Sequence, residues 1–543
     1  MTLPIHAVLP DLLAALRAGA RAVLVAPPGA GKTTCVAPAL LDEPWVAGGQ
    51  IWLLSPRRLA ARAAAERMAE LAGQKAGELI GYATRLESRQ SSATRILVVT
   101  EGIFRRRIQA DPELSSVAAG RFDEVHELSR EGDFGLALAL DAQAGLREDL
   151  RILAMSATLD GARFAALMDG APVIESEGRS FPIELRHIGR AAEMRIEDAM
   201  AGAIRRALAE EKQGDLLAFL PGVGEIERTA ERLAGLPEGV ALHRLHGSLD
   251  PADQRAALRT APSGTRKVIL ATSIAETSLT IDGVRIVVDS GLARRPRHDL
   301  AAGVTRLVTE RASQAAVTQR AGRAGRQGPG IVYRLWEAAA TAGLPPFDPP
   351  EILESDLTGL VLDCAVWGVP DPAGLRWLDA PPASSVSEAR RRLAAIGALD
   401  AEGRATPHGR QIADLPLEPR LAHMLVASAQ AGEAKSAADV AALIPERGLG
   451  GTSVDLARRR ANWRREKGPR AEGARGLARR WLGLVGAKSG GETDDAALAR
   501  CLIRAFPDRI ARRRDASGET WASAGGRGFR LDPADPLARA QWL

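Results

Sequence analysis

The stretch VAPPGAGKTT, residues 25–34, decides the fold of this chain. An apolar run, Ala22 to Val25, leads into it, and a segment that can begin a helix follows it. A glycine-rich turn between a strand and a helix is the arrangement of a phosphate-binding P-loop. The glycines allow successive N–H groups to point inward, Lys32 can reach β- and γ-phosphates, and the Thr33 hydroxyl can ligate Mg²⁺.

The loop departs from the strict P-loop pattern at its entry. Ala26 occupies the position of the first glycine, and Pro27 and Pro28 stiffen the backbone. A purely structural glycine turn is an alternative. The loop alone also does not distinguish a kinase, a GTPase, a transporter ATPase and a helicase, so the distinction must come from other parts of the sequence.

Short apolar runs alternate with alanine-rich helical stretches from residue 20 to about residue 335. Such runs are typical of parallel strands buried on both faces, and their spacing fits βαβ crossovers. We therefore expect two α/β domains in tandem, with a boundary near residue 175. The runs are RAVLVAP, QIWLLSP, TRILVVT, RILAMSAT, DLLAFLPG, RKVILATS, VRIVVDSG and GIVYRLW.

Residues 122–127, FDEVHE, place two adjacent carboxylates after an expected strand. Asp123 suits the Mg²⁺ shell, and Glu124 suits the orientation and deprotonation of an attacking water. An acidic pair of this kind is often only a solvated turn, but together with the P-loop it favours hydrolysis of a nucleoside triphosphate. The metal site predicted from the sequence comprises Thr33, Asp123 and Glu124.

Residues 319–326, QRAGRAGR, are the most informative part of the chain. Positions i, i+3, i+4 and i+7 of this segment are expected on one face of a helix, and they hold Gln319, Gly322, Arg323 and Arg326. Arginines that project from a second domain onto a bound γ-phosphate would stabilise the transition state of its transfer. The alternative is a basic helix that contacts the backbone of a nucleic acid.

The chain contains, in this order, APPGAGKTT, SPRRLAARAAAERMA, TEGIFRRR, DEVH, SAT, FLPGVGEIE, ATSIAETSLTIDGV and QRAGRAGR. In these motifs and their order it resembles the DEAH-box helicases of superfamily 2 along nearly its whole length. The segments FLPGVGEIE, PPASSVSEARRRLAAIGAL and AFPDRIARRR are most similar to the bacterial HrpB family of these helicases.

The resemblance implies an α/β fold: two tandem RecA-like parallel-sheet domains of the P-loop NTPase class, followed by α-helical winged-helix and ratchet-like domains. A helix, a wing around Asp400 to Thr406 and a second helix are also expected from the residues themselves. Relatives carry a strand-separating β-hairpin at RRPRHDLAAGVTRLVTERAS. The expected ranges are 1–175 and 176–345 for the RecA-like domains, 346–415 for the winged helix, 416–505 for the ratchet-like bundle and 506–543 for the start of a truncated C-terminal domain.

The resemblance also implies roles for individual residues. Binding of ATP falls to Pro28, Gly29, Ala30, Gly31, Lys32, Thr33 and Thr34, together with Arg67 and Asp282. Catalysis falls to Lys32, Asp123, Glu124, Gln319, Arg323 and Arg326, and coupling to domain movement falls to Ser156 and Thr158. Contacts with a nucleic acid backbone fall to Arg57, Arg58, Thr100, Glu101, Gly102, Thr272 and Ser273. The arginines, hydroxyls and loop N–H groups of this set suit phosphates and sugars rather than base edges.

The chain departs from the family pattern around the acidic pair. Relatives read HER where residues 126–128 read HEL, and Gly120 and Arg121 stand in what should be an aliphatic strand. A glycine and a charge are unfavourable in a buried parallel strand, so we expect altered stability there while still expecting turnover. Ser273 replaces an asparagine that is common in relatives.

The composition bounds the class of protein. With 543 residues, 46% hydrophobic and 26% charged, the chain suits a soluble protein of several domains. Three scattered cysteines and an N-terminus unlike a signal peptide favour a cytoplasmic protein without a membrane span. The basic segment from Arg458 to Arg480 is either an anion-binding surface or a solvated helix face, and its Trp463 and Trp481 suit core packing better than base stacking.

These features favour an ATP-dependent helicase or translocase on single-stranded nucleic acid, for which the resemblance implies RNA, with DNA as an alternative, and 3′→5′ movement. A second hypothesis is a nucleic-acid-stimulated ATPase that remodels protein–RNA complexes without processive unwinding. A third is a nucleotide-gated binding protein with weak catalysis, suggested by Leu128 and by Gly120 and Arg121. We expect ATP and Mg²⁺ as cofactors and a monomeric chain.

Overall fold

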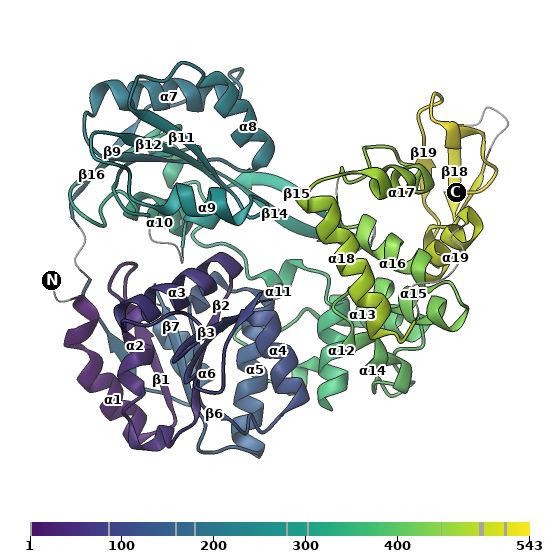
Figure 1. The fold of residues 1–543 in the computed structure, drawn as a ribbon, viewed down its shortest axis with the longest axis horizontal. Coiled ribbons are helices and arrows are strands. Elements are labelled where there is room, and N and C mark those ends of the chain that lie inside the picture. Colours follow the sequence, from purple (N-terminus) through teal and green to yellow (C-terminus); the bar gives the residue numbers. More distant parts are fainter. Residues whose placement is uncertain are drawn as a thin grey trace. The chain divides into compact units, whose positions relative to one another are not determined.

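The structure of the chain is a computed structural model that describes residues 3–84, 87–157, 160–178, 181–277, 281–300, 303–446, 448–487, 494–514 and 519–543. Within these ranges, no helix is both long enough and apolar enough to cross a membrane. The chain divides into two compact units, whose elements are labelled in Figure 1. The first unit comprises Met1–Ser355 with Leu375–Pro382, and the second comprises Asp356–Gly374 with Ala383–Leu543.

The first unit begins with an eight-stranded sheet in the order β4-β3-β5-β2-β6-β7-β1-β8. Its pairs are parallel except β3 with β4. The strands are β1 Arg21–Val25, β2 Gln50–Ser55, β3 Ile80–Ala83, β4 Ser88–Arg89, β5 Ile96–Thr100, β6 Val117–Phe122, β7 Arg151–Ser156 and β8 Val173–Glu175. The helices packed on it are α1 Leu9–Ala18, α2 Lys32–Leu40, α3 Arg58–Leu71, α4 Glu101–Ala110, α5 Arg130–Gly145 and α6 Gly161–Leu167.

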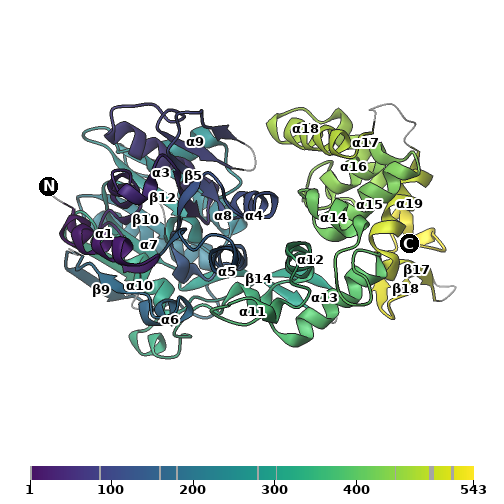
Figure 2. The same ribbon diagram turned by 90° about the horizontal axis from the view of Figure 1, so that it is seen from below.

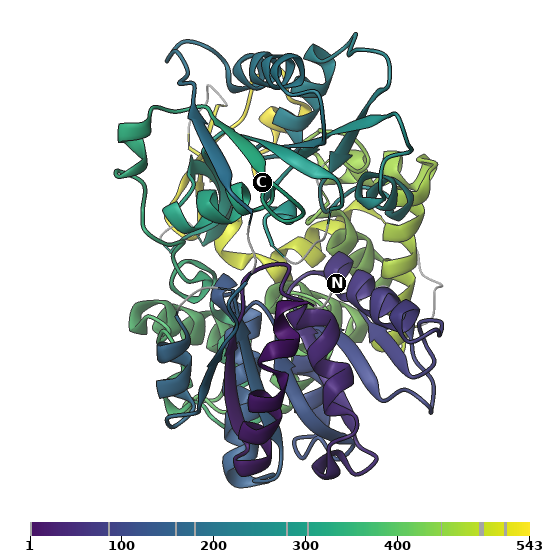
Figure 3. The ribbon, with the colours of Figure 1, turned by 90° about the vertical axis from the view of Figure 1, so that its left-hand side faces the viewer.

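A second, wholly parallel sheet follows in the same unit, in the order β11-β12-β10-β13-β16-β9. Figure 3 shows the two sheets in separate lobes, with the first in purple and blue and the second in teal. The strands are β9 Ile183–His187, β10 Asp215–Phe219, β11 Val240–Leu245, β12 Arg266–Ala271, β13 Val284–Asp289 and β16 Gly330–Arg334. The helices are α7 Ile196–Glu210, α8 Val223–Arg232, α9 Pro251–Leu258, α10 Gln314–Gly322 and the short α11 Glu351–Glu354.

The apolar runs of the sequence all form strands of these two sheets, which confirms the predicted pair of parallel-sheet domains. The predicted hairpin is also present, as the antiparallel pair β14 Leu292–Asp299 and β15 Val304–Arg311. Strands β9 and β11 had no apolar run to reveal them, because they lie at sheet edges and keep several side chains partly exposed. The domain ranges given above remain predictions.

The second unit starts with α12 Thr358–Trp367 and the winged helix, in which α13 Ala383–Ala395 and α14 Pro407–Asp414 flank a wing closed by an antiparallel bridge between Leu399 and Ala405. A bundle follows, formed by α15 Pro419–Gln430, α16 Ala434–Leu443, α17 Leu456–Arg465, α18 Pro469–Leu484 and α19 Asp495–Ala505 (Figure 2). The unit ends in an antiparallel sheet of β17 Ala511–Arg513, β18 Thr520–Ser523 and β19 Gly528–Arg530.

The basic segment of the sequence forms α17 and α18, and part of it serves the fold. Arg460 and Arg464 pair with Asp495 and Asp439, and Arg470 pairs with Glu446. The tryptophans of these helices are buried, which confirms their predicted place in the core. The basic side chains left exposed in this segment include Arg458, Arg465, Lys467, Arg479 and Arg480.

Candidate active site

The P-loop and the acidic pair meet at the carboxyl edge of the first sheet. The Lys32 ammonium lies 2.9 Å from Oε2 of Glu124, and the Thr33 hydroxyl donates to Oδ2 of Asp123 at 2.8 Å. Strand order explains the meeting, because β1 and β6, which lead into the two segments, both flank β7. The structure therefore brings together the lysine, hydroxyl and carboxylates that the sequence assigned to nucleotide and Mg²⁺.

The P-loop backbone is shaped to receive an anion. Gly29 and Gly31 have φ angles of +88° and +96°, a region that side chains disfavour. Helix α2 begins directly after Gly31 without a side-chain cap, so its first-turn N–H groups point toward the loop. A helix N-terminus of this kind attracts phosphate through its free N–H groups and its dipole. The residues present thus fit a triphosphate.

The buried carboxylates differ in their affinity for protons. Burial and the neighbouring charge of Glu124 raise the pKa of Asp123. Burial also disfavours the charged form of Glu124, but the Lys32 ammonium outweighs it and holds the pKa of Glu124 below its usual range. Glu124 is therefore ionised at neutral pH, the state that a general base requires.

His126 links the acidic pair to the strand β7. Its Nδ1 accepts a hydrogen bond from the N–H of Ala157 at 3.1 Å, and its Nε2 lies 3.6 Å from Oε2 of Glu124. Burial lowers the pKa of His126, so the ring is neutral. The sequence motifs alone indicate no role for this histidine. The one sequence signal for His126 is its place directly after the acidic pair. Of the residues expected to couple the site to domain movement, Ser156 ends β7 and Thr158 lies outside the described residues.

The arginines of the second sheet approach Glu124, but not from one helix face as predicted. Helix α10 ends at Gly322, so Arg323 lies in the turn that follows it and Arg326 lies in a bend beyond. Glycines favour this early end, and a Cβ at Gly325 would come within 2.8 Å of Ile183. The charge of Glu124 acts on both arginines, whose pKa values burial lowers.

Arg320, to which the sequence motifs assign no role, holds this segment in place. It is buried, donating to Glu276 at 3.1 Å and to Asp289 at 2.9 Å. Arg323 in turn donates to the backbone oxygen of Glu276. Gln319, expected to assist catalysis, lies half-buried near the end of α10.

The residues assigned to nucleic acid occupy different settings. Arg57 bridges the two sheets, because it donates to the Ser273 oxygen at 2.7 Å and to Glu127 at 3.4 Å. Thr277 of the second sheet's domain also donates to Glu127. Arg58 and Ser273 are exposed, whereas Thr100, Gly102 and Thr272 are half-buried.

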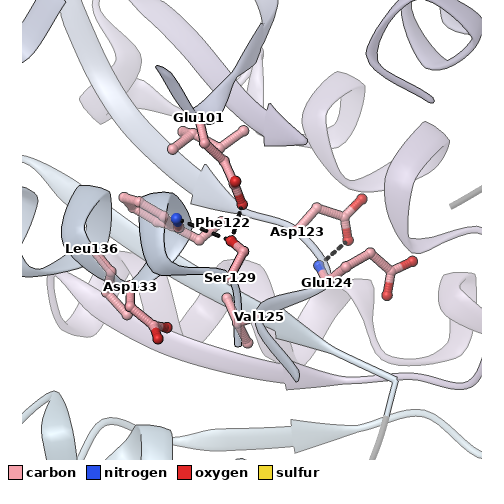
Figure 4. A pocket seen from close by; sticks show the side chains of 10 residues that line it. Glu101, Phe122, Asp123, Glu124, Val125, Ser129, Asp133 and Leu136 are labelled. Atoms are coloured by element: carbon pink, nitrogen blue, oxygen red, sulfur yellow. Dashed lines mark hydrogen bonds between the residues drawn. The ribbon is translucent and has the colours of Figure 1, made fainter. Parts of the chain in front are cut away.

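Glu101 turns its carboxyl group into a pocket beside the acidic pair. It accepts from the Ser129 hydroxyl at 2.7 Å, and Ser129 caps α5 by accepting from the Gly132 N–H (Figure 4). Burial raises the pKa of Glu101 to about 8, so it is largely protonated at neutral pH. The assignment of Glu101 to nucleic acid remains a prediction.

Arg67 and Asp282, assigned to the nucleotide, contact other side chains. Arg67 is exposed on α3 and pairs with Glu70, and Asp282 accepts from Gln327 at 2.8 Å. Both assignments remain predictions.

The departures beside the acidic pair are accommodated by the fold. Strand β6 forms despite Gly120 and Arg121, and both residues are buried in it. Leu128 adopts a left-handed backbone conformation with φ of +49°, and its carbonyl oxygen accepts from the N–H of Glu351. Neither departure separates Lys32 from Glu124.

Family models match three parts of the chain. The DEAD/DEAH box helicase model matches residues 7–166, and the helicase conserved C-terminal domain model matches residues 199–328. The winged-helix model of the helicase associated domain (HA2) matches residues 389–417.

Whole-chain comparisons point the same way. The chain is 46% identical to the ATP-dependent RNA helicase HrpB of Escherichia coli (strain K12), over 100% of this chain and 66% of that protein. It is 36% identical to the pre-mRNA-splicing factor ATP-dependent RNA helicase prp22 of Schizosaccharomyces pombe, over 81% of this chain and 38% of that protein. A crystal structure of the Escherichia coli DEAH/RHA helicase HrpB superposes with a TM-score of 0.90 and 45% identity, over 99% of this chain and 67% of that one. The chain thus spans about two thirds of the length of its HrpB relative.

Proposed function

The chain belongs to the DEAH-box helicases of the HrpB family, and from this premise we propose that it is an ATP-dependent RNA helicase. We propose further that it moves 3′→5′ along single-stranded RNA and separates duplexes. Both relatives named above are called ATP-dependent RNA helicases, which supports RNA over DNA.

One observation carries the proposal: Glu124 of the acidic pair interacts both with the P-loop and with two arginines of the second sheet's domain. Lys32 contacts Glu124 directly, and the charge of Glu124 acts on Arg323 and Arg326. A site shared between two domains couples nucleotide hydrolysis to domain movement, which is what a motor requires.

The residues of the first sheet divide the work of holding the substrate. The N–H groups of residues 29–34 and the Lys32 ammonium would bind the phosphates. Thr33 and Asp123 would hold Mg²⁺, which neutralises charge on the β- and γ-oxygens when bound. Glu124 would orient the attacking water and accept its proton, with His126 beside it linking this site to β7.

The residues of the second sheet complete the site and grip the strand. Arg323 and Arg326 would stabilise the charge that develops on the γ-phosphoryl group. Thr272 and Ser273 stand at the carboxyl end of β12, as Thr100 does at the end of β5, so each domain offers hydroxyls to a nucleic acid backbone. Alternating grip by the two domains would convert closure into a step.

Strand displacement tests the proposal against its alternatives. RNA duplexes with either a 3′ or a 5′ single-stranded overhang are incubated with the chain, Mg²⁺ and ATP. We expect separation only of the duplex with the 3′ overhang and only with ATP. Robust ATP hydrolysis without separation of either duplex would instead indicate remodelling of ribonucleoprotein. Binding of ATP without hydrolysis would indicate a nucleotide-gated binding protein.

We also propose that the chain acts as a monomer in the cytoplasm. The thiols of Cys35, Cys364 and Cys501 are free, which suits a reducing compartment.

A further inference from the structure

Arg121 is a fully buried cation in the middle of the first sheet. Its exposed fraction is 0%, and in register it lies between Leu53 of β2 and Leu153 of β7. A buried charge is costly unless it is paired and fully hydrogen-bonded. An aliphatic residue would fill this strand position without that cost. The stability of the fold therefore does not explain why an arginine stands here.

The contacts of Arg121 connect it to the P-loop. Its Nη2 donates to the backbone oxygen of Lys32 at 3.1 Å and lies 3.0 Å from the sulfur of Met155. Among the described residues, its Nε and Nη1 are buried and have no hydrogen-bond partner. One arm of the guanidinium therefore holds the first turn of α2, and the others are not used by the fold.

Arg121 stays charged in this setting. A guanidinium is not deprotonated near neutral pH in proteins, and Asp123 follows Arg121 two positions along the chain, so Arg121 is a cation. Because it belongs to a central strand, its charge is fixed in place. Lys32 differs, because it is a long flexible side chain whose ammonium pairs with Glu124.

Among the side chains of the first sheet's domain, the charges at the P-loop balance only if Arg121 is included. The buried cations Lys32 and Arg121 offset the buried anions Asp123 and Glu124. Without Arg121 these side chains of the first sheet would sum to −1, and a polyphosphate would meet a net negative site. If Lys32 leaves Glu124 for phosphates, Arg121 is the cation of the first sheet that stays near Asp123, while Arg323 and Arg326 act on Glu124 from the second sheet's domain.

We propose that Arg121 is a positioning residue for nucleotide binding, which holds the Lys32 turn and supplies a fixed positive charge beneath the P-loop. This inference rests on the proposed function, since it takes the loop to be the nucleotide site. It assigns a use to a residue that departs from the aliphatic pattern of this strand.

The test compares Arg121→Leu, Arg121→Met and Arg121→Lys with the wild type. ADP affinity is measured by calorimetry, once with Mg²⁺ and once with EDTA, and thermal unfolding is measured without nucleotide. The matched control is Arg460→Leu, which removes an arginine of 4% exposure from α17 in the second unit. We expect this control to leave ADP affinity unchanged.

We expect Arg121→Leu to weaken ADP binding about tenfold, as the loss of one charge at intermediate dielectric predicts. The loss should be larger in EDTA, because Mg²⁺ supplies positive charge of its own. The unfolding midpoint should be unchanged or higher, since a costly buried charge is gone. Arg121→Lys should recover most of the affinity, and KM for ATP should rise while kcat stays within about threefold, because Glu124 remains.

ADP affinity within twofold of the wild type in both conditions would overturn this inference alone. A fall in kcat with KM unchanged would also overturn it. If Arg121→Leu does not fold, Arg121→Met, an unbranched neutral side chain closer in length, carries the same comparison. A wild-type chain that binds no ADP would overturn the proposed function as well.

Discussion

At the scale of single residues, Glu124 has to pair with Lys32 in the resting site and also act as a base in the proposed reaction. In the structure it holds Lys32 at 2.9 Å, yet the proposed chemistry needs it free to accept a proton from water. Bound phosphates would resolve this conflict, because they would attract the ammonium away from the carboxylate. Pairing with Lys32 also keeps the pKa of Glu124 low, so the base is not lost to protonation in the resting site.

Replacing this carboxylate separates binding from hydrolysis. Glu124→Gln keeps the size of the side chain but cannot accept the proton, so we expect ATP hydrolysis to fall about 10²–10⁴-fold, a typical contribution of general-base catalysis. Nucleotide affinity, measured by calorimetry, should stay near that of the wild type. Glu113→Gln, an exposed carboxylate of the same sheet's domain, is the control and should hydrolyse ATP normally.

Residues that belong to a short motif of known chemistry are predictable from the sequence. Lys32, Thr33, Asp123 and Glu124 were predicted together, and the structure brings them together. His126 was passed over, because its value lies in a hydrogen bond from Ala157, which strand order rather than spacing creates. The role proposed for Arg121 was also not predicted, because a charged residue in an apolar strand indicated only altered stability.

At the scale of elements, the P-loop depends on a backbone shape that only glycine tolerates. Gly31 has a φ of +96°, and a Cβ there would lie 2.8 Å from Leu3 and 3.3 Å from the Cys35 sulfur. The turn therefore combines a left-handed conformation with close packing. Its shape fixes the direction of the first N–H groups of α2.

Gly31→Ala should therefore lower the free energy of unfolding by about 1–3 kcal/mol and abolish measurable ADP binding. Gly73→Ala is the matched control, since Gly73 also has a positive φ of +69° but a Cβ there would meet open space. It should cost about 1–2 kcal/mol and leave ADP binding intact. Equal ADP affinity in the two variants would argue against the P-loop shape as the cause.

The packing of α14 on α15 contains a pH-sensitive contact. His408 and His423 share a hydrogen bond of 2.7 Å between their ring nitrogens. Burial, together with the charges of His408 and Arg504, lowers the pKa of His423 to about 4. A depressed folded-state pKa means that stability is complete above about pH 6.5 and is lost as the pH falls toward 4.

We therefore expect His423→Gln to reduce the fall of the unfolding midpoint between pH 7.5 and pH 5 relative to the wild type. The carboxylates titrate in both proteins, so the difference between the two curves isolates the histidine pair. Parallel curves would show that the pair does not contribute.

Element boundaries were the weakest part of the sequence predictions. The run QRAGRAGR fits one helix by spacing, yet α10 ends at Gly322, because glycine disfavours helix and Gly325 packs against Ile183. The eight apolar runs named in the sequence all form strands, since continuous apolar runs signal burial on both faces, but the short buried strand Ile80–Ala83 was not among them. Edge strands such as Val240–Leu245 lack that signal.

At the scale of the whole molecule, the site exists only where the two sheets of the first unit meet. Arg57 and Thr277 join them through Glu127, and Arg323 and Arg326 bring positive charge toward Glu124. Under the proposed function, this sharing would make hydrolysis sensitive to a nucleic acid that alters the fit of the sheets. The motifs predict which segments of the two domains form the site. They do not predict that Arg57 donates hydrogen bonds to Ser273 and Glu127.

Arg326→Ala should leave nucleotide affinity within about threefold, because binding falls mainly to the P-loop. Hydrolysis should fall about 10³–10⁵-fold, the range in which arginine fingers act. Arg306→Ala, an exposed arginine of the hairpin, is the control for nucleotide hydrolysis without RNA. If Arg326→Ala hydrolyses ATP at the wild-type rate, Arg326 of the second sheet's domain has no role in catalysis.

The most direct test of the central claim is steady-state ATP hydrolysis with and without single-stranded RNA, in the wild type and in Glu124→Gln. The account predicts turnover that RNA stimulates in the wild type and that is lost in Glu124→Gln under both conditions. Wild-type turnover that no RNA changes, or turnover that survives in Glu124→Gln, would contradict the claim that this site is an RNA-coupled motor.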